Sequence, residues 1–368
     1  MSGTAAADLA VVGCGVIGLS IAWRCAQRGL RVTAYDPAPG GGASRVAAGM
    51  LAPVGEAYFG EAALTGLLVE SHRRWAGFAA EVGRYGPTGY RTDGTLLLAS
   101  TVDDLAEARR LWAYQTSVGL PVTPLPAAVL REREPALHPR LRGGALTTDH
   151  QVDPRRLLAA LAAAARAAGV RIVTGRVDDL AALPAGRVVV AAGCGSARLT
   201  GLPVRPVKGQ LLRLRAPDGG AAVLRHVIRG IADGRRVYLV PRPDGEVVVG
   251  ATEEERADAV PTAGAALDLL RAATDLVPEL AEYELAEVCV GHRPGTPDNA
   301  PILGELRPGV FVATGHYRHG VLAAPATADA LAGLVTGKSD GGLAAPFGPD
   351  RFAAGTARAL AAAPGGGA

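Results

Sequence analysis

Lysine and aromatic residues are scarce in this chain of 368 residues. Lys208 and Lys338 are its only lysines, so nearly all of its 38 basic residues are arginines, and aromatic residues make up only 4%. The arginines are interleaved with acids along the chain, and the formal net charge is +3. Because no block of basic residues forms, the composition disfavours a nucleic acid as the partner.

Cysteines and long apolar runs are also few. The four cysteines show no Cys-x-x-Cys spacing and the seven histidines show no metal-ligand spacing, so neither a disulfide framework nor a metal site is predicted. No uncharged apolar run of about eighteen residues occurs, and no basic region precedes the first apolar run. We therefore expect a cytoplasmic protein without a membrane span or a signal peptide.

The chain does have enough apolar material for a large core. Hydrophobic residues make up 49% and charged residues 20%, and the length fits about two domains. Segments of α/β type lie near the start, the middle and the end, around a β-rich insert at about 205–289. Predicted helices span 16–28, 64–82, 102–118, 154–168, 267–276 and 322–335, and predicted strands span 8–12, 31–35, 94–99, 170–174, 187–192, 210–215, 237–240, 246–250 and 310–313.

A glycine motif lies between the first strand and the first helix. Gly13, Gly15 and Gly18 form Gly-x-Gly-x-x-Gly, and Asp36 follows the second strand. The first two glycines permit a tight turn and the close approach of a pyrophosphate, and the third lets helix and strand pack closely. Asp36 can accept hydrogen bonds from ribose hydroxyls. The motif predicts a dinucleotide site without separating FAD from NAD; a glycine-rich turn that binds nothing is the alternative.

Three further motifs lie far apart in the chain. They are Ala47-Ala48-Gly49-Met50-Leu51-Ala52-Pro53, Arg293-Pro294-Gly295-Thr296 and Gly315-His316-Tyr317-Arg318-His319-Gly320. Together they resemble the glycine oxidase branch of the D-amino-acid oxidase family of flavoenzymes, over about residues 8–338. The resemblance implies FAD as the cofactor. It also implies non-covalent binding, because none of the four cysteines matches a position of covalent flavin attachment.

The resemblance and the order of the elements together predict how the chain is divided. We expect an α/β fold in which a Rossmann-like FAD-binding domain, built from discontinuous segments, lies beside a β-rich α+β substrate domain with an antiparallel sheet. The FAD-binding domain is predicted to comprise residues 1–85, 145–204 and 290–338, and the substrate domain 86–144 and 205–289. Residues 339–368, rich in glycine, alanine and proline, are predicted to form a flexible tail.

Flavin contacts are implied at positions that match the family. Ser44 would donate to a phosphate, small residues at 47–49 would let the backbone approach the flavin ring, and Val177, unless it is an ordinary core valine, would meet the adenine. The helix after Thr314 would direct its N-terminus at the flavin and stabilise the anionic reduced form. The expected cofactor-binding residues are Gly13, Gly15, Val16, Ile17, Gly18, Asp36, Pro37, Ala43, Ser44, Ala48, Gly49, Met50, Val177, His316, Tyr317, Arg318, His319, Gly320, Val321 and Leu322.

Arginine suits an amino-acid carboxylate because its guanidinium is planar and permanently charged. By resemblance, Arg293 binds the carboxylate, Arg318 is a second substrate-side arginine, and the Tyr238 hydroxyl joins the clamp. The alternatives are a surface charge for Arg293, a structural ion pair for Arg318 and a packed strand residue for Tyr238. No catalytic residue is assigned, since the flavin carries the redox step. The run Glu253-Glu254-Glu255 either approaches the mouth of the site or forms a solvated loop.

The resemblance implies an FAD-dependent amino-acid oxidase. Glycine, and by extension sarcosine or small D-amino acids, would transfer a hydride from Cα to flavin N5, giving glyoxylate, ammonia and, with oxygen, hydrogen peroxide. The imine would supply the thiazole of thiamine, so thiazole-synthesis enzymes are expected partners, beside self-association into a homo-oligomer. The alternatives are a D-amino-acid, sarcosine or proline-type oxidase or dehydrogenase, and a non-catalytic flavin-binding protein.

Overall fold

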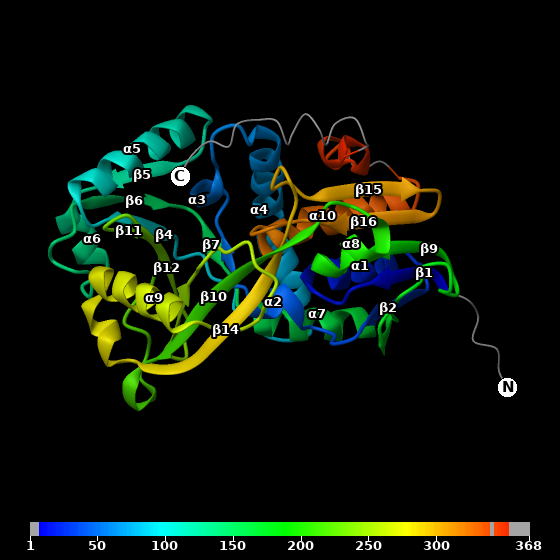
Figure 1. The fold of residues 1–368 in the computed structure, drawn as a ribbon, viewed down its shortest axis with the longest axis horizontal. Helices are drawn as coiled ribbons and strands as arrows, with labels where there is room; N and C mark the ends of the chain where they lie inside the picture. The colour runs from blue at the N-terminus through cyan, green and yellow to red at the C-terminus, as the bar shows by residue number, and fades with distance from the viewer. Residues whose placement is uncertain (1–6, 339–341, 353–368) are drawn as a thin grey trace.

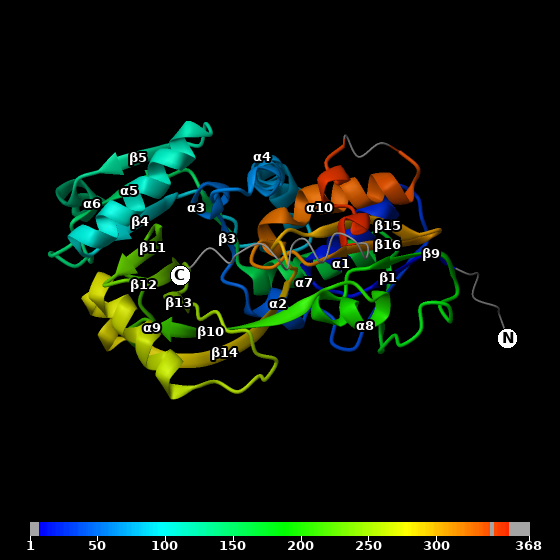
Figure 2. The ribbon, with the colours of Figure 1, turned by 45° about the horizontal axis from the view of Figure 1, so that its top comes forward.

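The computed structural model describes residues 7–338 and 342–352, which fold around two large β-sheets. Figures 1 and 2 show one lobe around each sheet. The lobe with the blue and orange segments is here termed the six-stranded lobe, and the lobe with the cyan and yellow segments the eight-stranded lobe.

The six-stranded lobe is an α/β layer structure. Its elements are β1 (Ala7–Val12), α1 (Val16–Gln27), β2 (Val32–Asp36), α4 (Ala62–Gly83), α7 (Pro154–Ala167), β8 (Arg171–Thr174), β9 (Ala185–Val190), β15 (Ile302–Arg307), β16 (Val310–Thr314) and α10 (Gly320–Val335). The strand order is β15-β16-β9-β1-β2-β8, and neighbours are parallel except for β15 and β16. Leu9 and Val11 pack under the four helices, whereas Ala10 and Val12 belong to the core on the opposite face, because side chains alternate along a strand.

The eight-stranded lobe is built on a mixed sheet. Its elements are β4 (Thr95–Ala99), α5 (Val102–Ser117), β5 (Val122–Leu125), α6 (Ala127–Arg133), β6 (Gly143–Thr147), β10 (Arg205–Arg215), β11 (Val227–Ala232), β12 (Arg235–Pro241), β13 (Glu246–Gly250), α9 (Ala263–Leu276) and β14 (Glu284–Gly295). The order is β14-β10-β13-β12-β11-β4-β6-β5. Leu96 and Ile228 pack against Leu276 of α9 on one face, whereas Leu97 packs against Trp112 of α5 on the other.

Strands β10 and β14 join the two lobes. They pair antiparallel from Arg205 opposite Gly295 to Arg215 opposite Glu284, and Figure 1 shows them side by side across the molecule. The chain enters β10 from β9 through α8 (Ser196–Thr200), and it leaves β14 toward β15. The remaining short elements lie near this junction: α2 (Gly42–Val46), β3 (Met50–Leu51), α3 (Pro53–Glu56) and β7 (His150–Gln151).

The turn after β1 brings α1 against the backbone of the turn itself. Gly13 has a φ of +112°, which an L side chain rarely adopts, and an added Cβ there would lie 2.3 Å from the Ala191 carbonyl oxygen. A Cβ on Gly18 would lie 1.8 Å from the Gly13 carbonyl oxygen. The close helix–strand contact predicted from the glycine motif is therefore present.

Helix α4 holds the first turn of α10 in place. Pro325 lies inside α10 and has no N–H to donate. The Ser71 hydroxyl donates to the Leu322 carbonyl at 2.7 Å and accepts from the Ala326 N–H at 3.2 Å, and the Trp75 indole donates to the same carbonyl at 2.8 Å. The start of α10 is thereby fixed against the six-stranded lobe.

The structure confirms the predicted fold class and all the predicted helices and strands, with ends shifted by a few residues. One correction concerns the sheet of the eight-stranded lobe, since β4 and β11 run parallel within it. The strands β3, β5, β6, β7, β11, β14 and β15 and the short helices α2, α3, α6 and α8 were not predicted from the sequence. The first five residues of β14, at 284–288, are all exposed, and three of them are charged or small. Because β14 is an edge strand, no apolar alternation marked it.

The division into domains stays a prediction. The predicted boundary between residues 289 and 290 falls inside β14, which pairs with β10 without a break there. The flexible tail at 339–368 likewise stays a prediction. Within residues 342–352, Phe347 is buried and Arg351 donates to Asp298 at 2.8 Å; the rest of that tail lies outside the described residues. Within residues 7–338 and 342–352, no helix combines the length and the apolar character needed to cross a membrane.

Replacing Gly18 by alanine tests the contact between α1 and the turn. Because its Cβ would overlap the Gly13 carbonyl, we expect Gly18→Ala to lower the free energy of unfolding by about 1–3 kcal/mol. Gly77→Ala in α4 is the matched control, since its Cβ meets nothing within 4 Å, and it should raise stability by about 0.5–1 kcal/mol. Urea denaturation measures both; equal effects would contradict the packing argument.

Candidate active site

A cavity of about 1440 Å³ lies where the two lobes meet. It is lined by the turn after β1, by α2 and the loop behind it, by the start of α10 and by β10–β14. All the residues predicted to contact cofactor or substrate line this cavity except Gly18, which packs under the turn instead. Their binding roles stay predictions, but the fold brings them together.

One end of the cavity has the groups of a nucleotide site. The Asp36 carboxylate accepts hydrogen bonds from the N–H groups of Cys14 and Ala38, both at 2.7 Å, and each oxygen keeps capacity for a further donor. The Ser44 oxygen accepts from the Val16 N–H at 3.1 Å, at the N-terminus of α1. The Ser44 hydroxyl hydrogen therefore stays available to donate, as its predicted contact with a phosphate requires.

The start of α10 forms a second wall, in which the two histidine side chains carry no formal charge. His319 is the N-cap of α10, and its side chain makes no capping hydrogen bond. Burial lowers the pKa of His316 to about 3 and that of His319 to about 4. Both rings are therefore neutral near pH 7, and the partial positive charge at this wall comes from the helix N-terminus.

Arg293 lies at the other end of the cavity, on β14. Its Nη1 donates to the Thr252 carbonyl at 3.0 Å, and an added Cβ on Gly209 of β10 would lie 2.6 Å from the same nitrogen. The guanidinium therefore lies directly over a position without a side chain. Tyr238 of β12 lines the same end, and burial raises the pKa of Tyr238, so its hydroxyl stays protonated and able to donate.

Arg318 forms ion pairs at the wall of the cavity. Its guanidinium lies 3.4 Å from Glu56 and 3.6 Å from Glu253. Glu56 also pairs with Arg229 at 2.5 Å, and, although burial opposes ionisation, Arg229 and Arg318 lower the pKa of Glu56 to about 2. The structural ion pair considered for Arg318 is therefore present, and its contact with substrate stays a prediction.

Sequence analysis did not single out Glu56 or Arg229. Arg229 is a charged residue within the apolar run of β11, and Glu56 lies three residues after the end of the motif at 47–53, so both carried a signal. Asp149 was missed as well. It accepts from the N–H groups of Val54 and Gly55, both at 3.1 Å, and thereby fixes α3, which carries Glu56.

The acidic run at 253–255 is divided between three partners. Glu253 lines the cavity and pairs with Arg318. Glu254 accepts from the Thr252 hydroxyl at 2.9 Å, and Glu255 pairs with Arg205 at 3.0 Å outside the cavity lining. Only Glu253 therefore approaches the mouth of the site.

Comparison with known proteins decides the family. A protein-family model described as FAD dependent oxidoreductase matches residues 8–334. The chain belongs to this family of FAD-dependent oxidoreductases. The predicted family and the predicted cofactor, FAD, are thereby confirmed, whereas the non-covalent mode of binding stays a prediction.

The oxidoreductase is similar to characterised relatives along most of its length. It is 34% identical to glycine oxidase of Geobacillus kaustophilus (strain HTA426), over 92% of this chain and 96% of the relative. The crystal structure of glycine oxidase from Geobacillus kaustophilus matches with a TM-score of 0.88 and 33% identity, covering 95% of this chain and 100% of that one.

Two further relatives carry ThiO in their names. The oxidoreductase is 32% identical to the "Bifunctional protein ThiO/ThiG" of Nostoc sp. (strain PCC 7120 / SAG 25.82 / UTEX 2576), over 89% of this chain and 52% of the relative. It is 34% identical to the "Putative thiamine biosynthesis oxidoreductase ThiO" of Rhizobium etli (strain ATCC 51251 / DSM 11541 / JCM 21823 / NBRC 15573 / CFN 42), over 88% and 94%. The chain spans about half the length of the bifunctional relatives it matches.

The residues of the cavity fit FAD. The glycine turn would receive the pyrophosphate at the N-terminus of α1, Asp36 would accept from ribose hydroxyls, and the start of α10 would lie beside the flavin ring. By contrast, no group of three or more histidine, cysteine or acidic side chains in the described part of the chain could hold a metal ion.

The buried histidines predict how stability depends on pH. Burial lowers the pKa of His72, His316 and His319 from 6.5 to about 4, 3 and 4. Between about pH 6.5 and 4 the unfolded chain therefore binds more protons at these positions, so they make the free energy of unfolding fall as the pH is lowered. Asp149 acts in the opposite direction between about pH 6 and 4, because burial raises its pKa to about 6.

Two variants of the holoenzyme separate these contributions. His316→Asn should flatten the fall of unfolding free energy between pH 6.5 and 4 by about 1.4 kcal/mol per pH unit, the value for one proton. Asp149→Asn should steepen it below pH 6. Urea denaturation at constant FAD across this range measures both slopes, and an unchanged slope in His316→Asn would contradict the assignment.

Proposed function

We propose that this FAD-dependent oxidoreductase oxidises glycine through its imine to glyoxylate and ammonia, with oxygen as acceptor and hydrogen peroxide as co-product. The observation that carries the proposal is the environment of Arg293. Among the described residues its hydrogen-bond partners are carbonyls, those of Thr252 at 3.0 Å and Lys208 at 3.5 Å. Its charge is therefore available to a carboxylate inside the cavity that fits the flavin.

Binding at Arg293 would orient the substrate. The guanidinium and the Tyr238 hydroxyl would hold the carboxylate, so that Cα is fixed relative to the flavin ring. FAD, when bound, supplies the redox chemistry by accepting two electrons and passing them to oxygen. Arg293 and Tyr238 contribute position and charge.

The side chains near the substrate end favour a neutral substrate amine. The carboxylates of Glu56 and Glu253 are already paired, Glu56 with Arg229 and Arg318 and Glu253 with Arg318, so neither is left without a cation and ready to hold an ammonium ion. The low pKa values of His316 and His319 keep both rings uncharged. A neutral amine has the lone pair that assists oxidation of the adjacent C–H bond, so this environment suits the proposed reaction.

The imine intermediate suggests a place for the reaction in thiamine synthesis. We infer that the imine formed from glycine supplies the thiazole of thiamine and that a thiazole-synthesis enzyme is the partner. Similarity to the relative named as a thiamine biosynthesis oxidoreductase supports this inference. Self-association into a homo-oligomer is proposed with it.

A substrate panel tests the reaction. Purified, yellow protein is mixed with glycine, sarcosine, D-alanine, a larger D-amino acid and proline, and hydrogen peroxide is measured. We expect glycine to give the highest kcat/KM. A higher value for another amine would replace glycine as the substrate, and flavin-containing protein that releases no peroxide with any of them would contradict the oxidase.

Arg293→Ala should weaken the binding of every carboxylate substrate. Loss of a charge-assisted hydrogen bond costs about 1.5–3 kcal/mol, so KM for glycine should rise about 10- to 150-fold. Arg235→Ala is the control, because Arg235 lies on the same sheet, pairs with Asp275 at 2.8 Å and does not line the cavity. Steady-state kinetics measure both; normal turnover of Arg293→Ala at low glycine would show that the carboxylate binds elsewhere.

A further inference from the structure

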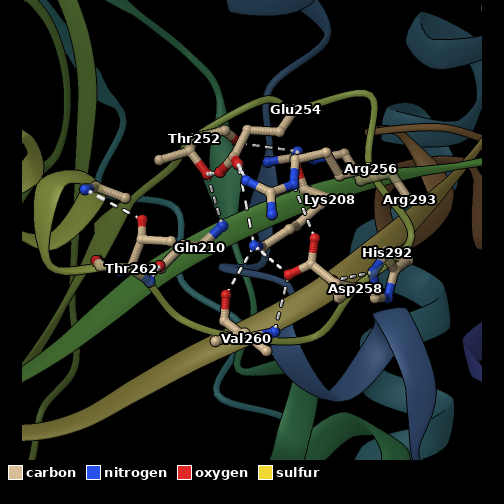
Figure 3. A network of polar contacts seen from close by, with 11 residues as sticks. Lys208, Gln210, Thr252, Glu254, Arg256, Asp258, Val260, Thr262, His292 and Arg293 are labelled. Atoms are coloured by element: carbon tan, nitrogen blue, oxygen red, sulfur yellow. Dashed lines mark hydrogen bonds and ion pairs between the residues drawn. The ribbon is translucent and has the colours of Figure 1, made fainter.

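Residues 251–262 form a segment, termed the strap, that crosses β10 and β14 beside Arg293 (Figure 3). Lys208 of β10 anchors the strap, and the Lys208 side chain is completely buried. Its Nζ donates to Asp258 at 2.8 Å and to the Val260 carbonyl at 2.7 Å. A buried ammonium that lost these partners would be left uncompensated, so the anchor holds the strap firmly.

Further hydrogen bonds hold both ends of the strap. The Gln210 side chain donates to the Thr262 carbonyl at 3.1 Å and accepts from the Thr262 N–H at 2.7 Å. The Gln210 N–H donates to the Thr252 hydroxyl at 2.9 Å. Figure 3 shows these contacts around Lys208 and Gln210. The residues between them are therefore held in one position relative to β10.

The strap brings a carboxylate into the cavity that Arg293 also lines. The Thr252 carbonyl accepts from Arg293 at 3.0 Å, and the next residue, Glu253, lines the cavity and lies 3.6 Å from Arg318. Burial and a hydrogen-bonding contact with Glu253 also raise the pKa of Tyr317. Glu253 is thus in contact with two side chains of the start of α10.

The positive charges at this end of the cavity are nearly all matched. Arg229 pairs with Glu56, Arg236 pairs with Glu107, and Arg318 pairs with both Glu56 and Glu253. Among the described arginines that line the cavity from the eight-stranded sheet or the start of α10, Arg293 alone has no carboxylate partner. Arg45 also lines the cavity, but it lies on α2 next to Ser44, at the end of the cavity predicted to bind the nucleotide, so it does not belong to this group of arginines.

We propose that Glu253 restricts the site to amino acids with a single carboxylate. The inference rests on the proposed function, because it assumes that Arg293 holds the substrate carboxylate. A second carboxylate, on the nitrogen substituent or the side chain, would meet Glu253 and would find Arg318 already paired. A neutral substituent of the same size would meet no such repulsion, so the discrimination is one of charge and not of size.

Two ligands that differ by one charge test this proposal. Diglycolate has an ether oxygen where an N-carboxymethyl glycine has its amine, so it cannot be oxidised as an amine, and its monoamide has the same size with one carboxylate fewer. Their Kd values on the holoenzyme are measured from the change in the visible flavin spectrum. We expect the wild-type protein to bind the monoamide at least tenfold more tightly than diglycolate.

Glu253→Gln should reduce that preference about tenfold, the effect of one unit charge a few ångströms away at a half-exposed position. Glu255→Gln is the matched control, since Glu255 lies on the same strap, pairs with Arg205 and does not line the cavity, and it should leave the preference unchanged. Raising the salt concentration should also reduce the wild-type preference, because Glu253 is 53% exposed and its charge is screened.

Each outcome of the binding test has one meaning. An unchanged preference in Glu253→Gln, an equal change in Glu255→Gln, or failure of the monoamide to bind at all would overturn the proposal, the last because size would then exclude both ligands. Failure of the proposed function would show itself separately, as flavin-containing protein that binds these ligands but releases no peroxide with glycine.

Discussion

The antiparallel ladder between β10 and β14 fixes the positions of the residues that line the cavity from both lobes. These two strands cross between the lobes, and Gly209 lies opposite Gly291 in their register. A side chain on Gly209 would collide with the Arg293 guanidinium, and one on Gly291 would come within 3.1 Å of Val46 in α2. Two missing side chains therefore let Arg293 lie against the ladder and let α2, which carries Ser44, pack against it. The ladder thereby sets the position of Arg293 relative to the flavin-binding residues.

Where the two lobes meet, most of the cationic side chains described above are paired with carboxylates, and Arg293 is the one that the proposed substrate would pair with. A buried charge is tolerated when it is paired, as Lys208 is with Asp258. Arg229 and Arg318, which line the cavity, also have carboxylate partners. Arg293 has carbonyl partners only, which hold its geometry without neutralising it. The start of α10 adds a partial positive charge beside neutral histidines. An anionic substrate and a flavin that becomes more negative on reduction can therefore share one cavity.

Much of the fold could be predicted because its signals are local. Periodicity revealed the long helices and most of the core strands, although not β11, and the glycine motif with Asp36 indicated a nucleotide site before any tertiary contact was known. Arg293 was predicted through a short motif of unusual composition. The surroundings of Arg293 could not be predicted. The nearby ion pair joins Glu56 and Arg229, which are 173 residues apart, and Thr252 contacts Arg293 only through its backbone. The edge strand β14 was missed because one side of it has no neighbour, and an edge strand does not need apolar alternation.

Anaerobic reduction of the bound flavin by glycine is the decisive measurement, because it shows whether glycine and the flavin react in one cavity. The proposed oxidation of glycine requires a flavin bound at the opening strand, turn and helix, and an amino acid held by Arg293 in the same cavity. It predicts that glycine bleaches the visible absorption of the protein in the absence of oxygen and yields one glyoxylate for each flavin reduced. A protein purified without flavin, or a flavin that stays oxidised at saturating glycine, would contradict it.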